Sequence, residues 1–426
     1  MLVFLSDVHL TDGSSGTQIA PRAFKKFCDL LVNIIGDPSQ TKIHQVEVVL
    51  LGDIFDVIRS DLWLRDANKI DHPIRPWSAP TDKDSADWDL QMYVEEIVTK
   101  IINNPQNQEA IGYLQDFEKR CAHDLGVKLV VSYLIGNHDW LINRYPSTRQ
   151  DIAAFLGLTP AGYYTKNDFN YLRPFDSDGY PVFARHGDYY DPFNFEGDRN
   201  ASSLGDAIVI DLLNKFPAAV AASELGSNSD LIKQIKEIDN VRPLWEIPAW
   251  IQGLCRRYPE AEDRLHDLWN GLVDDFCALD FVHRHHQYDL EAALRLTEDF
   301  SFDRLRKIAE SWIAQKLFSN SDNYRSSAYG EEYLKNGQAR YVVYGHTHQA
   351  QQVPLDLMPP TAGGVTEALY FNTGTWRKVF EHTVYDAERL EFIGWYVMTF
   401  LVFYLPAEKE IDREYEVWSA SLGYGS

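Results

Sequence analysis

Two stretches near the N-terminus determine the fold: residues 2–9 read LVFLSDVH, and residues 46–56 read VEVVLLGDIFD. Each begins as a short apolar run, which is typical of a buried strand, and ends in polar residues that belong in a loop. The segment between them places four large apolar residues on one helical face: Phe24, Phe27, Leu31 and Ile34. A strand, a helix and a second strand in this order predict an α/β protein.

The same alternation of helix and strand continues along the chain. A second amphipathic helix is predicted by four residues at helical spacing: Leu90, Val94, Ile97 and Ile101. The apolar run Leu129–Ile135 predicts the next strand. Further strand patterns occur towards the C-terminus, at Arg340–Tyr344, Ala368–Phe371, Val379–Tyr385 and Phe392–Tyr404.

Residues 188–339 have a different character, with several helical patterns and no strong strand pattern. The helical patterns fall at Ala207–Phe216, Leu231–Ile238, Ala261–Leu272 and Phe302–Leu317. We therefore expect a discontinuous α/β core of residues 1–187 and 340–426, interrupted by a helical cap of residues 188–339.

Short polar motifs follow the predicted strands. They are Asp7-Val8-His9, Gly52-Asp53-Ile54-Phe55-Asp56, Gly136-Asn137-His138-Asp139, His186-Gly187-Asp188 and Gly345-His346-Thr347-His348. In open α/β sheets, ligand and catalytic groups gather at the carboxyl ends of the strands, where loops project side chains that packing does not occupy. Any one of these motifs alone is a weak signal, because Asp, Asn and Gly are ordinary turn residues. All five together predict a shared site.

The residue types in these motifs predict metal binding. The candidate ligands are Asp7, His9, Asp53, Asn137, His186, His346 and His348. Imidazole nitrogens with carboxylate and amide oxygens suit Mn²⁺, Fe or Zn²⁺. Seven ligands are too many for one closed site, so we expect two divalent ions, Mn²⁺ foremost, bridged by Asp53. Such a pair lowers the pKa of a shared water and favours in-line displacement at phosphorus.

These residues resemble the signature of the calcineurin-like metallophosphoesterases, D-x-H, G-D-x-x-D, G-N-H-[DE], H and G-H-x-H, over about residues 1–187 and 340–376. The resemblance implies a four-layer α/β/β/α core of two packed mixed sheets. It also implies hydrolysis of a phosphoester bond by a metal-bridging hydroxide. One ion would be held by Asp7, His9, Asp53 and His348, and the other by Asp53, Asn137, His186 and His346.

The resemblance also implies a proton-handling pair beside the metals. In that family the histidine of G-N-H is not a ligand but faces the scissile bond, which gives His138 the role of catalytic acid. The family pairs it with the second Asp of G-D-x-x-D, here Asp56, because a carboxylate fixes the imidazole tautomer and raises its pKa. Asp139 is the alternative partner.

The substrate class depends on which branch the chain resembles most. His186-Gly187-Asp188 and the helical cap resemble UDP-2,3-diacylglucosamine pyrophosphatases, which implies hydrolysis of a phosphodiester, pyrophosphate or phosphomonoester bond in a small-molecule or lipid-linked substrate. Gly136-Asn137-His138-Asp139 suits repair nucleases, and a non-catalytic scaffold on the same fold is a further alternative. A protein phosphatase does not fit, because Val57-Ile58-Arg59 follows Asp56 where those enzymes have Arg-Gly.

Composition limits the partners and the compartment. The 63 acidic and 40 basic residues give a formal charge of −23, which disfavours nucleic acid as a partner. The four cysteines form no CxxC pair, and no secretory leader pattern precedes Asp7, so we expect a cytoplasmic protein. The longest apolar run, Phe392–Pro406, is shorter than the roughly 20 residues of a bilayer span, although peripheral membrane contact through the cap stays open.

Four other segments allow functional interpretations. Residues 59–89 are expected to form a long loop, which is either a substrate-binding flap or a surface excursion. The stretch Ala207–Leu213 fits plain core, an acyl tunnel or a dimer contact. A phosphate-binding role for Arg256 and Arg257, or an extra metal site at His283, His285 and His286, competes in each case with an ordinary solvated surface.

Overall fold

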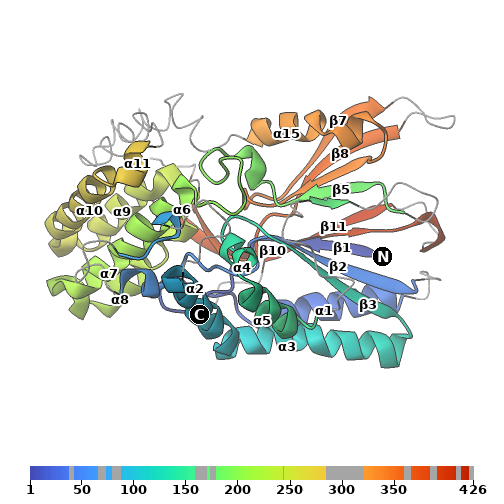
Figure 1. Cartoon of the computed structure of the whole chain (residues 1–426), viewed down its shortest axis with the longest axis horizontal. Helices are drawn as coiled ribbons and strands as arrows, with labels where there is room; N and C mark the ends of the chain where they lie inside the picture. The colour runs from blue at the N-terminus through green and yellow to red at the C-terminus, as the bar shows by residue number, and fades with distance from the viewer. Residues whose placement is uncertain are drawn as a thin grey trace.

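The computed structural model describes most of the chain as two mixed β-sheets with helices on their outer faces (Figure 1). The described residues are 1–37, 43–65, 73–78, 88–158, 170–172, 179–242, 244–284, 321–358, 366–383, 391–408 and 414–421. The prediction of an α/β protein with two mixed sheets is confirmed.

The first sheet has the strand order β11-β10-β1-β2-β3, and β9 pairs with β10 beyond this path. Its strands are β1 (Leu2–Leu5), β2 (Gln45–Leu51), β3 (Lys128–Leu134), β9 (Lys378–His382), β10 (Phe392–Phe403) and β11 (Tyr415–Ser421). The pairs β1–β2 and β2–β3 are parallel, and β10 runs antiparallel to β1, β9 and β11. The carboxyl ends of β1, β2 and β3 therefore lie at the same edge.

The second sheet has the order β4-β5-β6-β8-β7. Its strands are β4 (Asn170–Leu172), β5 (Val182–Arg185), β6 (Tyr341–Tyr344), β7 (Gln351–Met358) and β8 (Thr366–Asn372). The central strands β5, β6 and β8 are parallel, and the outer strands β4 and β7 are antiparallel to their neighbours.

The two sheets pack face to face because alternate residues along each strand point to opposite sides. On β1, Leu2 and Phe4 join an apolar cluster that also contains Val343 and Phe371 of the second sheet. Val3 and Leu5 point the other way, into the core beneath the helices. The outer face of the second sheet packs against Tyr324, Ala328 and Leu334 of α15 (Ser321–Gly330) and α16 (Glu332–Lys335).

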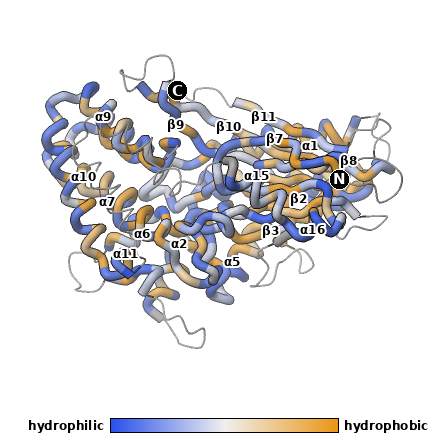
Figure 2. Tube along the Cα trace, turned by 90° about the horizontal axis from the view of Figure 1, so that it is seen from above, coloured by the Kyte–Doolittle hydropathy of each residue, from blue (hydrophilic) through white to orange (hydrophobic). Residues whose placement is uncertain are grey.

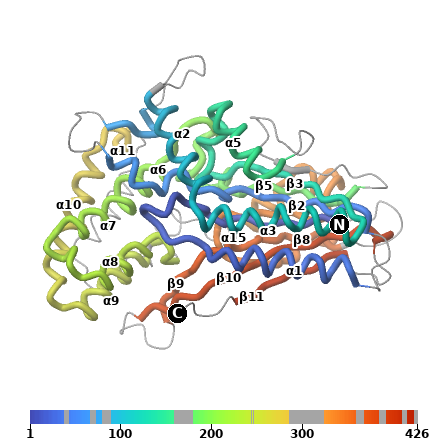
Figure 3. The backbone as a smooth tube through the Cα atoms, turned by 90° about the horizontal axis from the view of Figure 1, so that it is seen from below, coloured from blue at the N-terminus to red at the C-terminus, as the bar shows by residue number. Residues whose placement is uncertain are grey.

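The helices before β5 lie mainly over the outer face of the first sheet, where α1 and α3 run side by side (Figure 3). They are α1 (Arg22–Ile35), α2 (Trp88–Asn103), α3 (Pro105–Arg120), α4 (Trp140–Arg144) and α5 (Pro146–Leu156). The apolar stripe predicted for the first helix is buried, and Phe27 packs on Trp376 and Phe400. Helix α3 was not predicted.

The segment between β5 and α15 is helical in its described part and extends to the left of the sheets in Figure 1. Its helices are α6 (Leu204–Ile208), a π-helix (Val209–Asn214), α7 (Lys215–Ala222), α8 (Ser229–Ile235), α9 (Ile247–Arg257), α10 (Glu262–Cys277) and α11 (Asp280–Arg284). Hydrophilic and hydrophobic residues alternate along them, as expected for amphipathic helices (Figure 2). The limits of the cap stay a prediction, and Phe302–Leu317 lies outside the described residues.

Two local predictions need adjustment. The helix expected at Leu231–Ile238 ends at Ile235, and a short 3₁₀ turn, Ile238–Asn240, follows it. The expected loop 59–89 contains 3₁₀ turns at Asp61–Leu64 and Pro76–Ser78, and α2 begins at Trp88, so the loop ends earlier than predicted. In the described part of the chain, no helix is long and apolar enough to cross a membrane.

Candidate metal centre

The loops that carry the predicted ligands start at the carboxyl ends of five parallel strands, three in the first sheet and two in the second. Asp7 follows β1, Asp53 follows β2, Asn137 follows β3, His186 follows β5 and His346 follows β6. Backbone hydrogen bonds join neighbouring loops: Asp7 N donates to Gly52 O, and His9 N donates to Asp53 O. The seven predicted side chains consequently converge at the edge where the two sheets meet.

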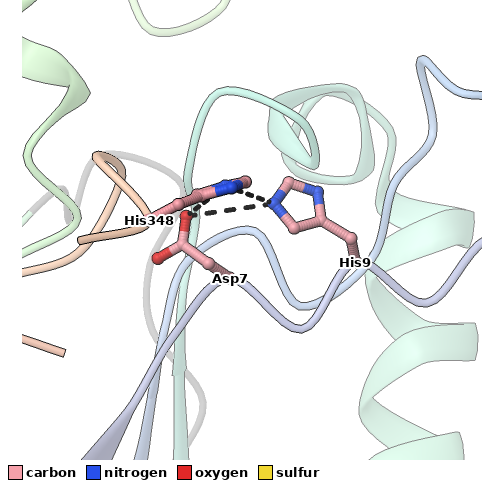
Figure 4. Close-up of side chains that lie close together, drawn as sticks. All are labelled: Asp7, His9 and His348. Atoms are coloured by element: carbon pink, nitrogen blue, oxygen red, sulfur yellow. Dashed lines mark hydrogen bonds and ion pairs between the residues drawn. The ribbon is translucent and has the colours of Figure 1, made fainter. Parts of the chain in front are cut away.

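The first group of side chains consists of Asp7, His9 and His348 (Figure 4). Nε2 of His9 lies 3.0 Å from Nε2 of His348, and Nε2 of His348 lies 3.2 Å from Oδ1 of Asp7. If an ion lay about 2.1 Å from each of the two imidazole nitrogens, the N–ion–N angle would be about 90°, which is a normal coordination angle. The three side chains therefore fit a common cation.

The second group consists of Asp53, His186 and His346, and Asn137 adjoins it. Oδ2 of Asp53 lies 3.2 Å from Nε2 of His186, and Nδ1 of His346 lies 2.9 Å from Oδ1 of Asn137. Asp53 also reaches the first group, since its Oδ2 lies 3.9 Å from Nε2 of His9. Asp53 thus lies between the two groups, where the sequence places the bridging carboxylate.

The backbone at this edge is held in a sparsely populated conformation. In the described part of the chain, the non-glycine residues with positive φ are Asp7, His9, Asp53, His346 and His348, with φ between 52° and 70°. All five are predicted ligands. The left-handed region costs an L-residue roughly 1–2 kcal/mol. Such strain persists where the surrounding structure enforces it, and it clusters at functional sites.

Glycines leave room for the crowded ligands. A Cβ on Gly136 would overlap Oδ1 of Asp53 and would lie 2.7 Å from Cδ2 of His186. A Cβ on Gly52, whose φ is +84°, would lie 2.5 Å from Nδ1 of His186. The glycines in the G-D-x-x-D and G-N-H-D motifs therefore allow backbone and ligand side chains to pack directly against each other.

Outer hydrogen bonds aim three of the histidines. Nδ1 of His9 lies 3.0 Å from Oδ2 of Asp56, Nδ1 of His186 lies 2.9 Å from the carbonyl of Leu51, and Nε2 of His346 lies 2.9 Å from Oδ2 of Asp191. An acceptor on the outer nitrogen holds the proton there and leaves the inner nitrogen with a lone pair. This arrangement is typical of metal-ligating histidines.

Two of the residues that orient this centre, Asp191 and Asn194, were missed from the sequence. Nδ2 of Asn137 donates to Oδ1 of Asn194 at 3.1 Å, and Nδ2 of Asn194 donates to Oδ2 of Asp191 at 2.9 Å. Together with the His346 contacts these bonds close a ring of four side chains. The ring turns the Asn137 oxygen, rather than its nitrogen, towards His346 and the second group.

Asp56, not Asp139, contacts the imidazole of His138. Oδ1 of Asp56 lies 2.9 Å from Nδ1 of His138. Asp139 is engaged elsewhere, since it accepts from the Tyr133 hydroxyl at 2.7 Å and from the backbone N–H groups of Gly136 and Ile54. Nδ1 of His138 is thus bound to Asp56, and His138 also lies close to His9 and Asp53 in a third group of possible metal ligands.

The electrostatics of the site reflect many buried acidic groups. Burial raises the pKa of Asp7, and it raises the pKa of Asp139 to about 7 with a further contribution from Asp53. Burial alone would lower the pKa of His186, but Asp53 and Asp7 raise it to about 10. Burial likewise opposes protonation of His138, yet Asp56 and Asp53 raise its pKa to about 9. The acidic groups therefore favour cations at this position.

Two buried atoms in the centre, Oδ1 of Asp7 and Nε2 of His186, make no well-aligned hydrogen bond among the described residues, although each lies 3.2 Å from one neighbour, Nε2 of His348 and Oδ2 of Asp53 respectively. Both residues are at most 1% exposed. Buried polar atoms are normally paired, and an unpaired one calls for an explanation such as an ion. The donor set and these two atoms fit divalent metal ions, which the described His and Asp groups could hold.

The other candidate clusters from the sequence do not join this centre. Arg256 and Arg257 are exposed at the end of α9, where Arg257 contacts Gln234. His283 is exposed on α11, and His285 and His286 lie outside the described residues. In the stretch Ala207–Leu213, the side chains of Ala207, Ile210 and Leu213 are buried in the main apolar core.

No family model matches the sequence, and no curated protein matches it significantly. The chemical interpretation therefore depends on the arrangement of the site itself.

Proposed function

We propose that the chain is a two-metal phosphoesterase of the calcineurin-like metallophosphoesterase type, acting on a phosphoester or phosphoanhydride of a small-molecule or lipid-linked substrate. The observation that carries this proposal is the convergence of seven predicted ligands, five of them with positive φ, at one edge of two packed sheets. Motifs from the two ends of the chain reach the same point, which chance turn residues would not do.

In this proposal Asp7, His9, Asp53 and His348 hold one divalent ion, and Asp53, Asn137, His186 and His346 hold the other. Two such ions, when bound, lower the pKa of a shared water and neutralise charge that develops on a phosphoryl group. The mixture of nitrogen and oxygen ligands favours Mn²⁺, with Fe or Zn²⁺ as alternatives. Asp191, Asn194 and Asp56 keep the ligand atoms aimed inwards.

His138 would supply the proton to the leaving oxygen. Its side chain is 12% exposed, unlike the fully buried His9, so it can reach a bound substrate. Asp56 accepts from Nδ1 and, with Asp53, keeps the ring protonated at neutral pH. A protonated imidazole with a free Nε2–H is suited to general-acid catalysis.

A small substrate agrees with the surface charge of the chain. The formal charge of −23 would repel a polyanion such as DNA at distances that salt does not screen. A substrate with a single phosphoester group carries little charge, so the cations of the metal centre can attract it despite the negative charge of the whole chain. We also propose a cytoplasmic location, for which the spaced cysteines are the motivation.

The test is hydrolysis of bis(p-nitrophenyl) phosphate and of p-nitrophenyl phosphate by chelator-treated protein, with and without added Mn²⁺. We expect turnover of at least one compound only after metal is added, with about two Mn²⁺ bound per chain. Protein that binds two ions and hydrolyses neither compound would favour the non-catalytic scaffold. Protein that binds no metal would contradict the whole assignment.

A further inference from the structure

Three arginines from distant parts of the chain meet beside the first group of ligands. Arg59 follows the G-D-x-x-D motif, Arg242 belongs to the helical segment, and Arg377 follows β8. All three surround Asp239: Nη1 of Arg377 lies 2.7 Å from Oδ2 of Asp239, and Nε of Arg59 lies 3.6 Å from the same atom. Nη1 of Arg242 donates to the Asp239 carbonyl at 2.6 Å.

This cluster, Arg59, Arg242 and Arg377, touches the candidate metal centre at two points. Nη2 of Arg242 lies 2.9 Å from Nδ1 of His348, and Nη1 of Arg377 lies 3.8 Å from Oδ2 of Asp56. Arg242 is held in place by its own backbone, since its N–H donates to the carbonyl of Phe380 at 2.8 Å. The helical segment thereby adds a positive charge directly beside a predicted ligand.

The cluster has more N–H donors than its neighbours satisfy. Arg59 is 0% and Arg377 is 3% exposed, yet Nε and Nη1 of Arg59 and Nε and Nη2 of Arg377 have no hydrogen-bond partner among the described residues. Asp239 is shared by all three arginines, and Asp56 is already bonded to His9 and His138. Buried guanidinium groups with unmatched donors are favourable places for an anion.

The contact between Arg242 and His348 distinguishes this histidine from the other three. A guanidinium can only donate, so Nδ1 of His348 must accept from Arg242 and Nε2 carries the proton. Nε2 is the atom that faces Asp7 and His9. If Nε2 binds an ion, the proton moves to Nδ1, which can no longer accept from Arg242. A loaded centre would therefore release one Arg242 N–H group towards another acceptor.

We propose that Arg242, supported by Arg377 and Arg59, forms an anion subsite beside the metal centre and binds a second anionic group of the substrate. This inference rests on the proposed function, because the scissile phosphoryl group would occupy the metals themselves. The substrate class is then a phosphoester that carries another phosphate or carboxylate close to the bond that breaks. A neutral or singly charged phosphoester would leave the subsite unused.

The experiment compares the native chain with Arg242→Gln, each loaded with saturating Mn²⁺, by calorimetric titration. The probes are methylenediphosphonate and phosphonoacetate, which carry two anionic groups, and methylphosphonate, which carries one phosphonate. We expect the native chain to bind at least one doubly anionic probe about tenfold or more tightly than methylphosphonate, as a charge-assisted hydrogen bond allows. Arg242→Gln should lose this preference and bind methylphosphonate as before.

Mn²⁺ affinity, measured in the same variants without any anion, separates a subsite from a purely structural role. Removing Arg242 removes a competing positive charge from His348, so Arg242→Gln should bind Mn²⁺ as tightly as the native chain or more tightly. Weaker Mn²⁺ binding, or a retained preference for both doubly anionic probes, would overturn the inference. The matched control is Arg257→Gln, an exposed arginine of the same helical segment, which should change neither affinity.

The proposed function and the subsite fail in different ways. If the native chain binds no Mn²⁺, the metal centre itself is wrong. If it binds two ions and methylphosphonate but shows no preference for either doubly anionic probe, the centre stands and the subsite is wrong. Phosphonoacetate and methylenediphosphonate together show whether a carboxylate or a phosphate fits better.

Discussion

The carboxylate of Asp191 lies 2.9 Å from Nε2 of His346, and this contact determines which nitrogen of His346 faces the candidate metal centre. With its proton held on Nε2, the ring presents the lone pair of Nδ1 towards the side of Asn137, Asp53 and His186. Asp191 also accepts from Asn194, which in turn accepts from Asn137. The Asp191 carboxylate therefore orients two predicted ligands, His346 directly and Asn137 through the Asn194 amide. Asp191 is therefore a positioning residue.

Replacing Asp191 by Ala should weaken metal binding without unfolding the chain. Loss of an outer partner of a metal-ligating histidine costs about 10–100-fold in metal affinity. We expect the affinity for one of the two ions to fall more than the affinity for the other, because only the second group contacts Asp191. Competition with a fluorescent chelator measures both affinities.

Asp198→Ala is the matched control for this prediction. Asp198 lies in the same loop but is exposed, and its carboxylate accepts only from the backbone N–H of Asn200 among the described contacts. It should leave both affinities unchanged. Equal effects of the two variants would mean that Asp191 acts through loop stability and not through His346.

Asp53→Ala and His138→Ala should separate metal binding from proton transfer. Asp53 lies between the two ligand groups, so its loss should remove bound metal and activity together. His138 contacts Asp56 but belongs to neither proposed ligand set, so His138→Ala should keep two Mn²⁺ and lose about 10²–10⁴-fold in turnover. Metal content by elemental analysis and hydrolysis of bis(p-nitrophenyl) phosphate are the two measurements. Loss of metal from His138→Ala would contradict the acid role.

The strands and loops that hold the predicted ligands could be predicted from the sequence because the patterns that indicate them are local. An apolar run followed by Asp or Asn places a polar side chain at a strand end. The strands predicted at Leu2–Leu5, Val46–Leu51 and Leu129–Ile135 agree with β1, β2 and β3 to within one residue. β7 was missed because it is an edge strand with Pro354 and Asp356 and a register shift between them. Edge strands tolerate such residues, and the usual pattern is then lost.

The residues around the ligands could not be predicted because their partners are remote in sequence. Asp191 contacts a histidine 155 positions away, and Arg242 contacts one 106 positions away. Neither lies in a periodic pattern or a known motif. The pairing of His138 with Asp56 could be expected only from the family resemblance, and the alternative Asp139 is excluded as a contact by its bonds to Tyr133 and Gly136.

Gly136→Ala should damage the centre through packing alone. The added Cβ would overlap Oδ1 of Asp53, approach His186 and lie 2.8 Å from the backbone N of Asp53, which cannot simply turn aside as a side chain could. Overpacking of this kind costs about 1–3 kcal/mol in unfolding free energy, and here it also displaces a bridging ligand. Chemical denaturation and metal titration should both show the loss.

Gly112→Ala provides the comparison. Gly112 lies within α3, and a Cβ there meets nothing within 4 Å. Ala is favoured over Gly in a helix by about 1 kcal/mol, so this variant should be as stable as the native chain or more stable. A loss of stability equal to that of Gly136→Ala would indicate that the close approach at Gly136 does not matter.

The pH dependence of stability should report on Asp206, which lies in α6 outside the ligand set. Its Oδ2 accepts from Trp140 Nε1 at 3.1 Å and from Ser202 Oγ at 2.6 Å, but burial still raises its pKa to about 6. A raised carboxyl pKa means that the folded chain binds the proton more tightly than the unfolded chain. Asp206 therefore does not lower the free energy of unfolding below about pH 4, and it lowers it progressively as the pH rises towards 6.

Comparison of the native chain with Asp206→Asn isolates this effect, because the amide oxygen can still accept from Trp140 and cannot ionise. A shift of about two pKa units corresponds to about 3 kcal/mol, so the unfolding free energy of the native chain relative to Asp206→Asn should fall by up to about that amount between pH 4 and pH 7. Above the folded pKa the difference should become constant. Urea denaturation at several pH values measures it in metal-free protein, so that metal binding does not contribute. A difference that grows in the opposite direction would mean that the Asp206 carboxylate is stabilised by its donors, Trp140, Ser202 and the backbone N–H of Ser203, more than burial destabilises it.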